Sequence, residues 1–157
     1  MQENENVRSV NDRLAYFEQF IGKNSSGSFS PVGKWLKGTL LRVSLKGVAV
    51  EFTVRTEMTN PMGIMHGGIA ATILDEVCGI SVLALGREFA YTSINLNCDY
   101  LHFAKLGETV IAEAWIIRAG KNVVHVEGHI KDQAGKIIAK CASNLIQTSL
   151  KIPAFLG

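Results

Sequence analysis

The sequence predicts an α+β domain in which one curved, antiparallel, six-stranded sheet wraps around a long apolar helix, with a further helix at the N-terminus. Two predicted strands precede the apolar helix, and four strands rich in Val, Ile and Thr, joined by short turns, follow it; short connections favour antiparallel neighbours. Residues 67–85 are apolar on nearly every helical face and must therefore be covered on nearly every face. One sheet covers only one side of this helix, so we expect a second subunit on the other side: a homodimer.

Length and composition indicate one folded domain over residues 1–157. Hydrophobic residues make up 47% of the chain and charged residues 19%, which is typical of a globular protein. The net charge is +2 and no run of Lys or Arg is present, which argues against nucleic-acid binding. The start, MQENENVRSVNDR, is polar and does not resemble a secretory signal, and Asp75 and Glu76 interrupt the longest apolar run. We expect a cytoplasmic protein that does not enter membranes.

The three cysteines show neither a CxxC motif nor the Cys/His spacing of a metal site. They are Cys78, Cys98 and Cys141. We expect small buried thiols in a reducing compartment and no bound metal.

The expected elements follow from periodicity. Apolar residues at three- and four-residue spacing predict a helix over residues 5–21: Val7, Val10, Leu14, Phe17 and Ile21. The stretch GKNSSGSFSPVG predicts a loop, after which the core of the fold is expected over about 30–148. Alternating residues predict strands at 36–45, 47–57, 90–101, 108–119, 122–132 and 136–148.

The stretch NPMGIMHGGIAATILDE, residues 60–76, contains the candidate chemistry. A helix that begins at Gly67 presents unpaired N–H groups and a partial positive charge, which would stabilise a developing oxyanion. Gly68 lets a ligand approach this backbone closely. Asp75 lies eight residues further on, about 12 Å along the axis. Asp75 and Gly67 of one helix therefore cannot act on the same substrate carbonyl. In a dimer with two antiparallel helices, Asp75 of each chain would face Gly67 of the other, which gives two equivalent sites.

The pattern NxxGxxHGG at residues 60–68, followed by Ala-Thr at 71–72 and Asp75, resembles the signature of hotdog-fold acyl-CoA thioesterases. The phenylacetyl-CoA thioesterase branch is the most similar, and the resemblance runs from about residue 30 to 148. It implies hydrolysis of an acyl- or arylacyl-CoA to free acid and CoA. It also implies no cofactor beyond the CoA of the substrate, and dimers that pair again into tetramers.

The resemblance also implies a role for each motif residue. Asp75 falls at the catalytic carboxylate, as general base or nucleophile, and Gly67 at the backbone N–H that polarises the thioester carbonyl. Asn60 is expected to position the water or the carbonyl, and His66 to orient the loop. Ser93 matches a residue that supports the attacking water.

The coenzyme A moiety is expected to lie near Gly68, and its phosphates to contact Arg87, Arg118 and Lys121. These cations stand near predicted turns, where solvated charges are common, so a surface role is the alternative.

Structural roles compete with the catalytic ones. In the structural alternative, Asp75 pairs with an Arg or with backbone N–H groups, and Glu76 is then the substitute catalytic carboxylate. If Asp75 is catalytic, Glu76 is expected at solvent or at an interface. His66 would serve as a loop or N-cap residue, Asn60 as a turn residue and Ser93 as an ordinary strand residue. The N-terminal helix is expected to pack against the sheet or a neighbour, with a lid over the acyl chain as the alternative.

Two other functions remain open from the sequence. The first is a binding module that holds acyl-CoA without turnover, and the second is a hotdog hydratase or dehydratase. Release of free thiol separates hydrolysis from both, and a change in enoyl absorbance identifies a hydratase.

Overall fold

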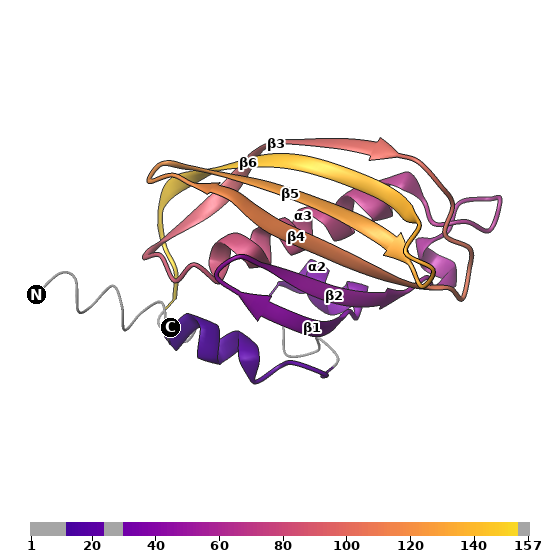
Figure 1. Ribbon diagram of the computed structural model, residues 1–157, viewed down its shortest axis with the longest axis horizontal. Helices are drawn as coiled ribbons and strands as arrows, with labels where there is room; N and C mark the ends of the chain where they lie inside the picture. Colours follow the sequence, from indigo (N-terminus) through magenta and orange to yellow (C-terminus); the bar gives the residue numbers. More distant parts are fainter. Residues whose placement is uncertain (1–11, 24–29, 154–157) are drawn as a thin grey trace, which may run out of the picture.

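The computed structural model describes residues 12–23 and 30–153, and it confirms the predicted fold class (Figure 1). Six antiparallel strands form one sheet in the order β1-β2-β4-β5-β6-β3. The sheet curves over the long helix α3, with β1 at one edge and β3 at the other.

The elements lie close to the predicted ranges. Residues 12–18 are helical. They are followed by α2 (Pro31–Leu36), β1 (Thr39–Ser44), β2 (Gly47–Thr53), a 3₁₀ turn (Thr56–Met58), α3 (Gly67–Leu83), β3 (Phe89–Tyr100), β4 (Thr109–Ala119), β5 (Val123–Asp132) and β6 (Ile137–Lys151).

The short helix α2 corrects the sequence analysis, which placed a loop and the start of a strand at these residues. The hydroxyl of Ser30 accepts a hydrogen bond from the N–H of Gly33, and Pro31 occupies the first turn. Both features favour the start of a helix. Lys37, at φ 55°, ends it in the left-handed region, so the first strand begins only at Thr39.

The N-terminal helix follows the predicted apolar stripe only in part. Phe17 is buried and Leu14 packs against the core, whereas Ile21 lies beyond the helix and is 44% exposed. Val7 and Val10 lie outside the described residues. The buried guanidinium of Arg13 donates a hydrogen bond of 3.2 Å to the carbonyl of Leu83, the last residue of α3. This bond attaches the N-terminal helix to the C-terminal end of α3, where unpaired carbonyls favour a cation.

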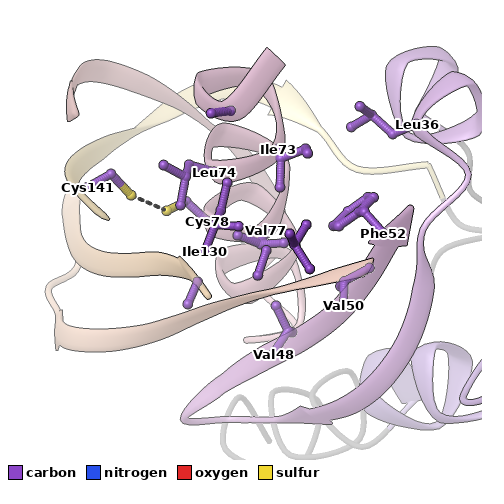
Figure 2. Close-up of a cluster of buried hydrophobic side chains, with 14 of the residues drawn as sticks. Leu36, Val48, Val50, Phe52, Ile73, Leu74, Val77, Cys78, Ile130 and Cys141 are labelled. Carbon is purple, nitrogen blue, oxygen red and sulfur yellow. Dashed lines mark hydrogen bonds between the residues drawn. The ribbon is translucent and has the colours of Figure 1, made fainter. Parts of the chain in front are cut away.

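The core lies between the concave face of the sheet and the inner side of α3 (Figure 2). The side chains of Ile73, Leu74 and Val77 are fully buried there, against residues of β2 and β5. Burying a side chain of this size stabilises a fold by about 1.5–3 kcal/mol. The core therefore holds α3 firmly by one side.

The cysteines belong to this core, as expected for Cys78 and Cys141, which are buried with their sulfurs 3.8 Å apart (Figure 2). Cys98 is half-buried and pairs with Cys141 across the β3–β6 ladder. The hydrogen bond to Cys141 and burial both raise the pKa of the Cys78 thiol. Three residues distant in the sequence thus lie together as free thiols.

The other side of α3 is not covered by the sheet. Gly68, Thr72, Asp75 and Gly79 follow one another at four-, three- and four-residue spacing and are exposed or half-buried. The second subunit that we expect here remains a prediction. No helix in the described part of the chain is long and apolar enough to cross a membrane.

Candidate functional site

His66 caps the start of α3. Its Nδ1 atom accepts a hydrogen bond of 2.9 Å from the N–H of Gly68, and its backbone carbonyl accepts from Ile69 and Ala70. The N–H of Gly67 forms no hydrogen bond with any described residue. The cap therefore occupies the Gly68 amide and leaves the Gly67 amide available to a ligand.

Asn60 and Gly67 line one cavity of about 270 Å³. The side-chain oxygen of Asn60 accepts a hydrogen bond of 2.9 Å from the N–H of Met62, which fixes it in a turn. Its NH₂ group keeps its donors for another partner. The backbone of the loop is held by bonds from Met65 to Ala104 and from His66 to Met58. The turn role and a ligand-binding role of Asn60 are therefore compatible.

Asp75 and Ser93 form the second half of the site. The hydroxyl of Ser93, on β3, donates a hydrogen bond of 2.8 Å to the carboxylate of Asp75, on α3. Both side chains are exposed, and Asp75 forms no ion pair with any described Arg or Lys. The alternative of a structural Asp75–Arg pair is therefore not seen among these residues.

The two halves lie apart within one chain. Gly67 and Asp75 are separated by eight residues of α3, which corresponds to about 12 Å. The chain thus presents a free amide beside Asn60 at one place and a carboxylate beside Ser93 at another.

The candidate phosphate-binding cations gather at the β4–β5 turn. Arg87 donates to the carbonyls of Ala119, Gly120 and Lys121, and it stacks over the ring of Tyr91. Its guanidinium is therefore already engaged by the protein.

Arg118 and Lys121 are exposed beside this turn. Arg87 follows the C-terminal end of α3, and so these cations lie at the opposite end of the helix from Gly67. Within one chain, the length of α3 therefore separates these cations from the Gly67 amide.

Glu76 was expected at solvent or at an interface, and the interface part of this expectation stays a prediction. Glu76 is half-buried, and it lines a second cavity of about 480 Å³. The hydroxyl of Ser30 donates to its carboxyl over 3.4 Å, and burial raises the pKa of the Glu76 carboxyl. The sequence indicates one wall of this cavity: Gly79, Ile80 and Leu83 follow Glu76 at i+3, i+4 and i+7, so they share its helical face, and they also line the cavity.

Comparison with known proteins shows the family. The model of the thioesterase superfamily matches residues 62–139. Human acyl-coenzyme A thioesterase 13 is 32% identical over 105 residues, which cover 66% of this chain and 75% of that protein. The chain belongs to the hotdog-fold acyl-CoA thioesterases, which are thioester hydrolases.

Solved structures agree with this assignment. Zebrafish thioesterase superfamily member 2 is 26% identical, with a TM-score of 0.68 and coverage of 76% of this chain and 86% of that one. The PaaI protein of E. coli, from the phenylacetic acid degradation operon, shares the fold at 19% identity, with a TM-score of 0.75 and coverage of 82% and 92%. A Streptococcus mutans protein solved with acetyl-CoA also shares it at 21% identity, with a TM-score of 0.68 and coverage of 73% and 91%.

Proposed function

We propose that the protein hydrolyses an acyl- or arylacyl-CoA thioester at a site shared by two subunits. The observation that carries this proposal is the contact of 2.8 Å between Ser93 and Asp75, on the helix whose first amide, at Gly67, is unpaired. In an antiparallel pair of α3 helices, Asp75 of one subunit faces Gly67 of the other.

In the general-base form of the mechanism, Asp75 accepts a proton from water as the water oxygen bonds to the thioester carbon. The Gly67 N–H of the other subunit then stabilises the oxyanion that develops on the carbonyl oxygen. Collapse of the tetrahedral intermediate breaks the C–S bond, and the proton held by Asp75 passes to the departing thiolate. Free acid and CoA result, with water as the only co-reactant.

The alternative form of this chemistry uses covalent catalysis. Asp75 would instead attack the thioester as a nucleophile, after which water hydrolyses the anhydride that forms. In either form Ser93 holds the carboxylate by its hydrogen bond, Asn60 donates from its NH₂ group, and His66 maintains the helix start.

The exposed edge of the sheet supports a dimer. β3 is an edge strand of 12 residues, and Ile94 at its middle is 56% exposed. An edge strand of this length presents unpaired backbone groups that pair readily with another chain. Two β3 strands side by side would continue the sheet and bring the uncovered sides of the two α3 helices together. Arg118 and Lys121 would then be the cations for the CoA phosphates, and the dimers would pair again into a tetramer.

The experiment that tests the function is thiol release from a panel of short, long and aryl acyl-CoAs, with wild type beside Asp75→Asn. We expect wild-type turnover and a fall in kcat of about 10²-fold or more in Asp75→Asn, the usual effect of losing a positioned base. An unchanged folded spectrum and oligomeric state show that the variant is intact.

Two results would contradict the proposal. Full activity of Asp75→Asn would exclude this carboxylate and direct attention to Glu76. Binding of acyl-CoA by wild type without any thiol release would favour a binding module instead.

A further inference from the structure

The cavity of about 480 Å³ is used by no step of the proposed mechanism. Its walls come from the N-terminal helix, α2, the second half of α3, the sheet and the end of β6, and they are largely apolar. Phe17, Phe20, Phe52 and Leu83 are among the apolar residues that line it. The volume falls within the range of about 300–1,000 Å³ that is usual for small-molecule sites.

Asp75 and Ser93 do not line the cavity themselves, but residues that do line it stand close to them on the same two elements. Gly79 lines the cavity and stands one turn after Asp75, about 6 Å along the helix axis. Tyr91 also lines it and precedes Ser93 by two residues in a regular stretch of β3, so both side chains share one face of that strand about 7 Å apart. An acyl group attached to a carbonyl at Asp75 would therefore extend into this cavity.

Glu76 places a carboxyl group in the apolar wall. It forms no ion pair with any described residue, and its hydrogen bond from Ser30 is long, at 3.4 Å. A half-buried carboxyl with unused lone pairs favours a ligand that supplies a hydrogen bond. A hydroxyl suits both forms of this group, because it donates to the carboxylate and accepts from the protonated acid.

We propose that this cavity receives the acyl group and that Glu76 selects acyl groups that carry a hydroxyl in their distal part. The inference rests on the proposed function, which it deepens by naming the substrate class. Residues 12–23, which form one wall, lie outside the segment 62–139 that matches the family model. The N-terminal helix thus acts as part of the acyl compartment, in agreement with the lid alternative.

The test compares matched substrates that differ by one hydroxyl. Thiol release is measured for ω-hydroxydecanoyl-CoA against decanoyl-CoA, and for para-hydroxyphenylacetyl-CoA against phenylacetyl-CoA. For at least one pair we expect wild type to prefer the hydroxylated ester by about tenfold or more in kcat/KM, mainly through KM, as for a hydrogen bond to a charged group. The preference disappears in Glu76→Leu and persists in part in Glu76→Gln, whose amide still bonds a hydroxyl. Glu51→Leu, which removes a carboxylate from β2 outside the cavity lining, keeps the wild-type ratio.

A second variant tests the compartment itself. Within the described part of one chain, a Cβ built at Gly79 meets no atom within 4 Å, and leucine favours the helix over glycine. Because Gly79 also lies on the side of α3 that would face a second subunit, sedimentation is used to show that Gly79→Leu keeps the wild-type assembly. We expect Gly79→Leu to lower kcat/KM for decanoyl-CoA relative to acetyl-CoA by about tenfold or more, with a smaller change in Gly79→Ala.

The outcomes separate the two proposals. Absence of thiol release from every ester overturns the proposed function, and calorimetric binding of free ω-hydroxydecanoic and decanoic acids then still tests the cavity. Hydrolysis without a hydroxyl preference in either pair, or with a preference that survives Glu76→Leu, overturns the selection by Glu76. An unchanged ratio of decanoyl- to acetyl-CoA in Gly79→Leu overturns the acyl compartment.

Discussion

Asp75 is exposed on the side of α3 that the sheet leaves uncovered, so folding of one chain does not strip its carboxylate of water. Desolvation occurs only when a partner or a substrate covers the group, and Ser93 is already in place to hold it. The neighbouring carboxyl of Glu76 is half-buried in the same chain, and its pKa is raised by that burial. Two adjacent acidic residues thus occupy different environments because they lie about 100° apart around the helix.

The role of the Gly67 amide can be tested by a substitution that removes its N–H. Proline is tolerated at the first position of a helix, and His66, with φ −62° and ψ 136°, has the extended backbone that a following proline requires. Gly67→Pro therefore removes the N–H while keeping the helix start. We expect kcat to fall by about 10²–10³-fold, as for loss of one oxyanion-hole donor, measured by thiol release.

The matched control is Gly67→Ala, which keeps the N–H. Its Cβ would meet the ring of Tyr100 at 3.5 Å, an ordinary contact, and so activity is expected to stay near wild type. Equal losses in both variants would show that crowding, rather than the missing amide, causes the effect.

The raised pKa of Glu76 predicts a pH-dependent stability. Between the pKa of the unfolded chain and the raised pKa of the folded one, the folded state binds more protons, so stability falls as pH rises through this window. Glu76→Gln removes the cost of ionising a buried group and can still accept the bond from Ser30. We expect a higher Tm than wild type above the folded pKa, with the gain shrinking toward acidic pH, measured by thermal unfolding across pH. If the gain in Tm did not vary with pH, it would come from packing and not from the ionisation of Glu76.

At the scale of elements, periodicity predicted the helices and strands that are long enough to show a regular apolar pattern. α3 begins at the predicted Gly67 and ends two residues before the predicted end, and the last four strands begin within a residue of their predicted starts. The helix α2 was missed because six residues are too few to show a helical period, and its start depends on the cap at Ser30.

The candidate site was likewise predictable from the sequence only in part. The family resemblance pointed to Ser93 as a support for the attacking water, since nothing local in β3 distinguishes Ser93 from another strand residue. Its hydrogen bond to Asp75 was not predicted. For Glu76, the sequence spacing indicates which residues of α3 share its face, but it does not predict the cavity, because part of the wall comes from residues 12–23, more than fifty positions earlier in the chain. Contacts between such distant segments depend on tertiary packing, which periodicity within one element does not encode.

The cap at the start of α3 predicts separable effects on stability and catalysis. His66→Ala removes the acceptor for the Gly68 N–H and is expected to cost about 1 kcal/mol in the free energy of unfolding, measured in denaturant. His66→Asn supplies another good cap and is expected to restore both stability and turnover. Restored stability with lost turnover would instead give the imidazole a chemical role.

At the scale of the whole molecule, the sheet is open at both edges, and the two edges differ. β3 is long, carries the exposed Ile94 and lies next to the side of the molecule that holds Asp75, whereas β1 has six residues. In the proposed dimer, two chains that pair through β3 would complete two reaction sites at once. Activity would then depend on assembly.

Ile94→Asp tests this dependence. A charge at the middle of the β3 edge disfavours pairing with a second strand, so we expect monomers by sedimentation and loss of thiol release. Leu41→Asp is the matched control, since Leu41 is 39% exposed on β1 at the opposite edge, and it is expected to leave the dimer intact. An active monomeric Ile94→Asp would show that one chain suffices.

Part of the wall of the larger cavity comes from the two ends of the described chain, from within residues 12–23 and from Leu150 to Pro153. The residues proposed to cleave the thioester lie between positions 60 and 93. Under the two proposals, part of the acyl compartment therefore comes from segments outside the hydrolytic residues, while Glu76 and Gly79 lie among them. A directed library confined to the two ends would then reshape only that part of the compartment and leave the hydrolytic residues unchanged.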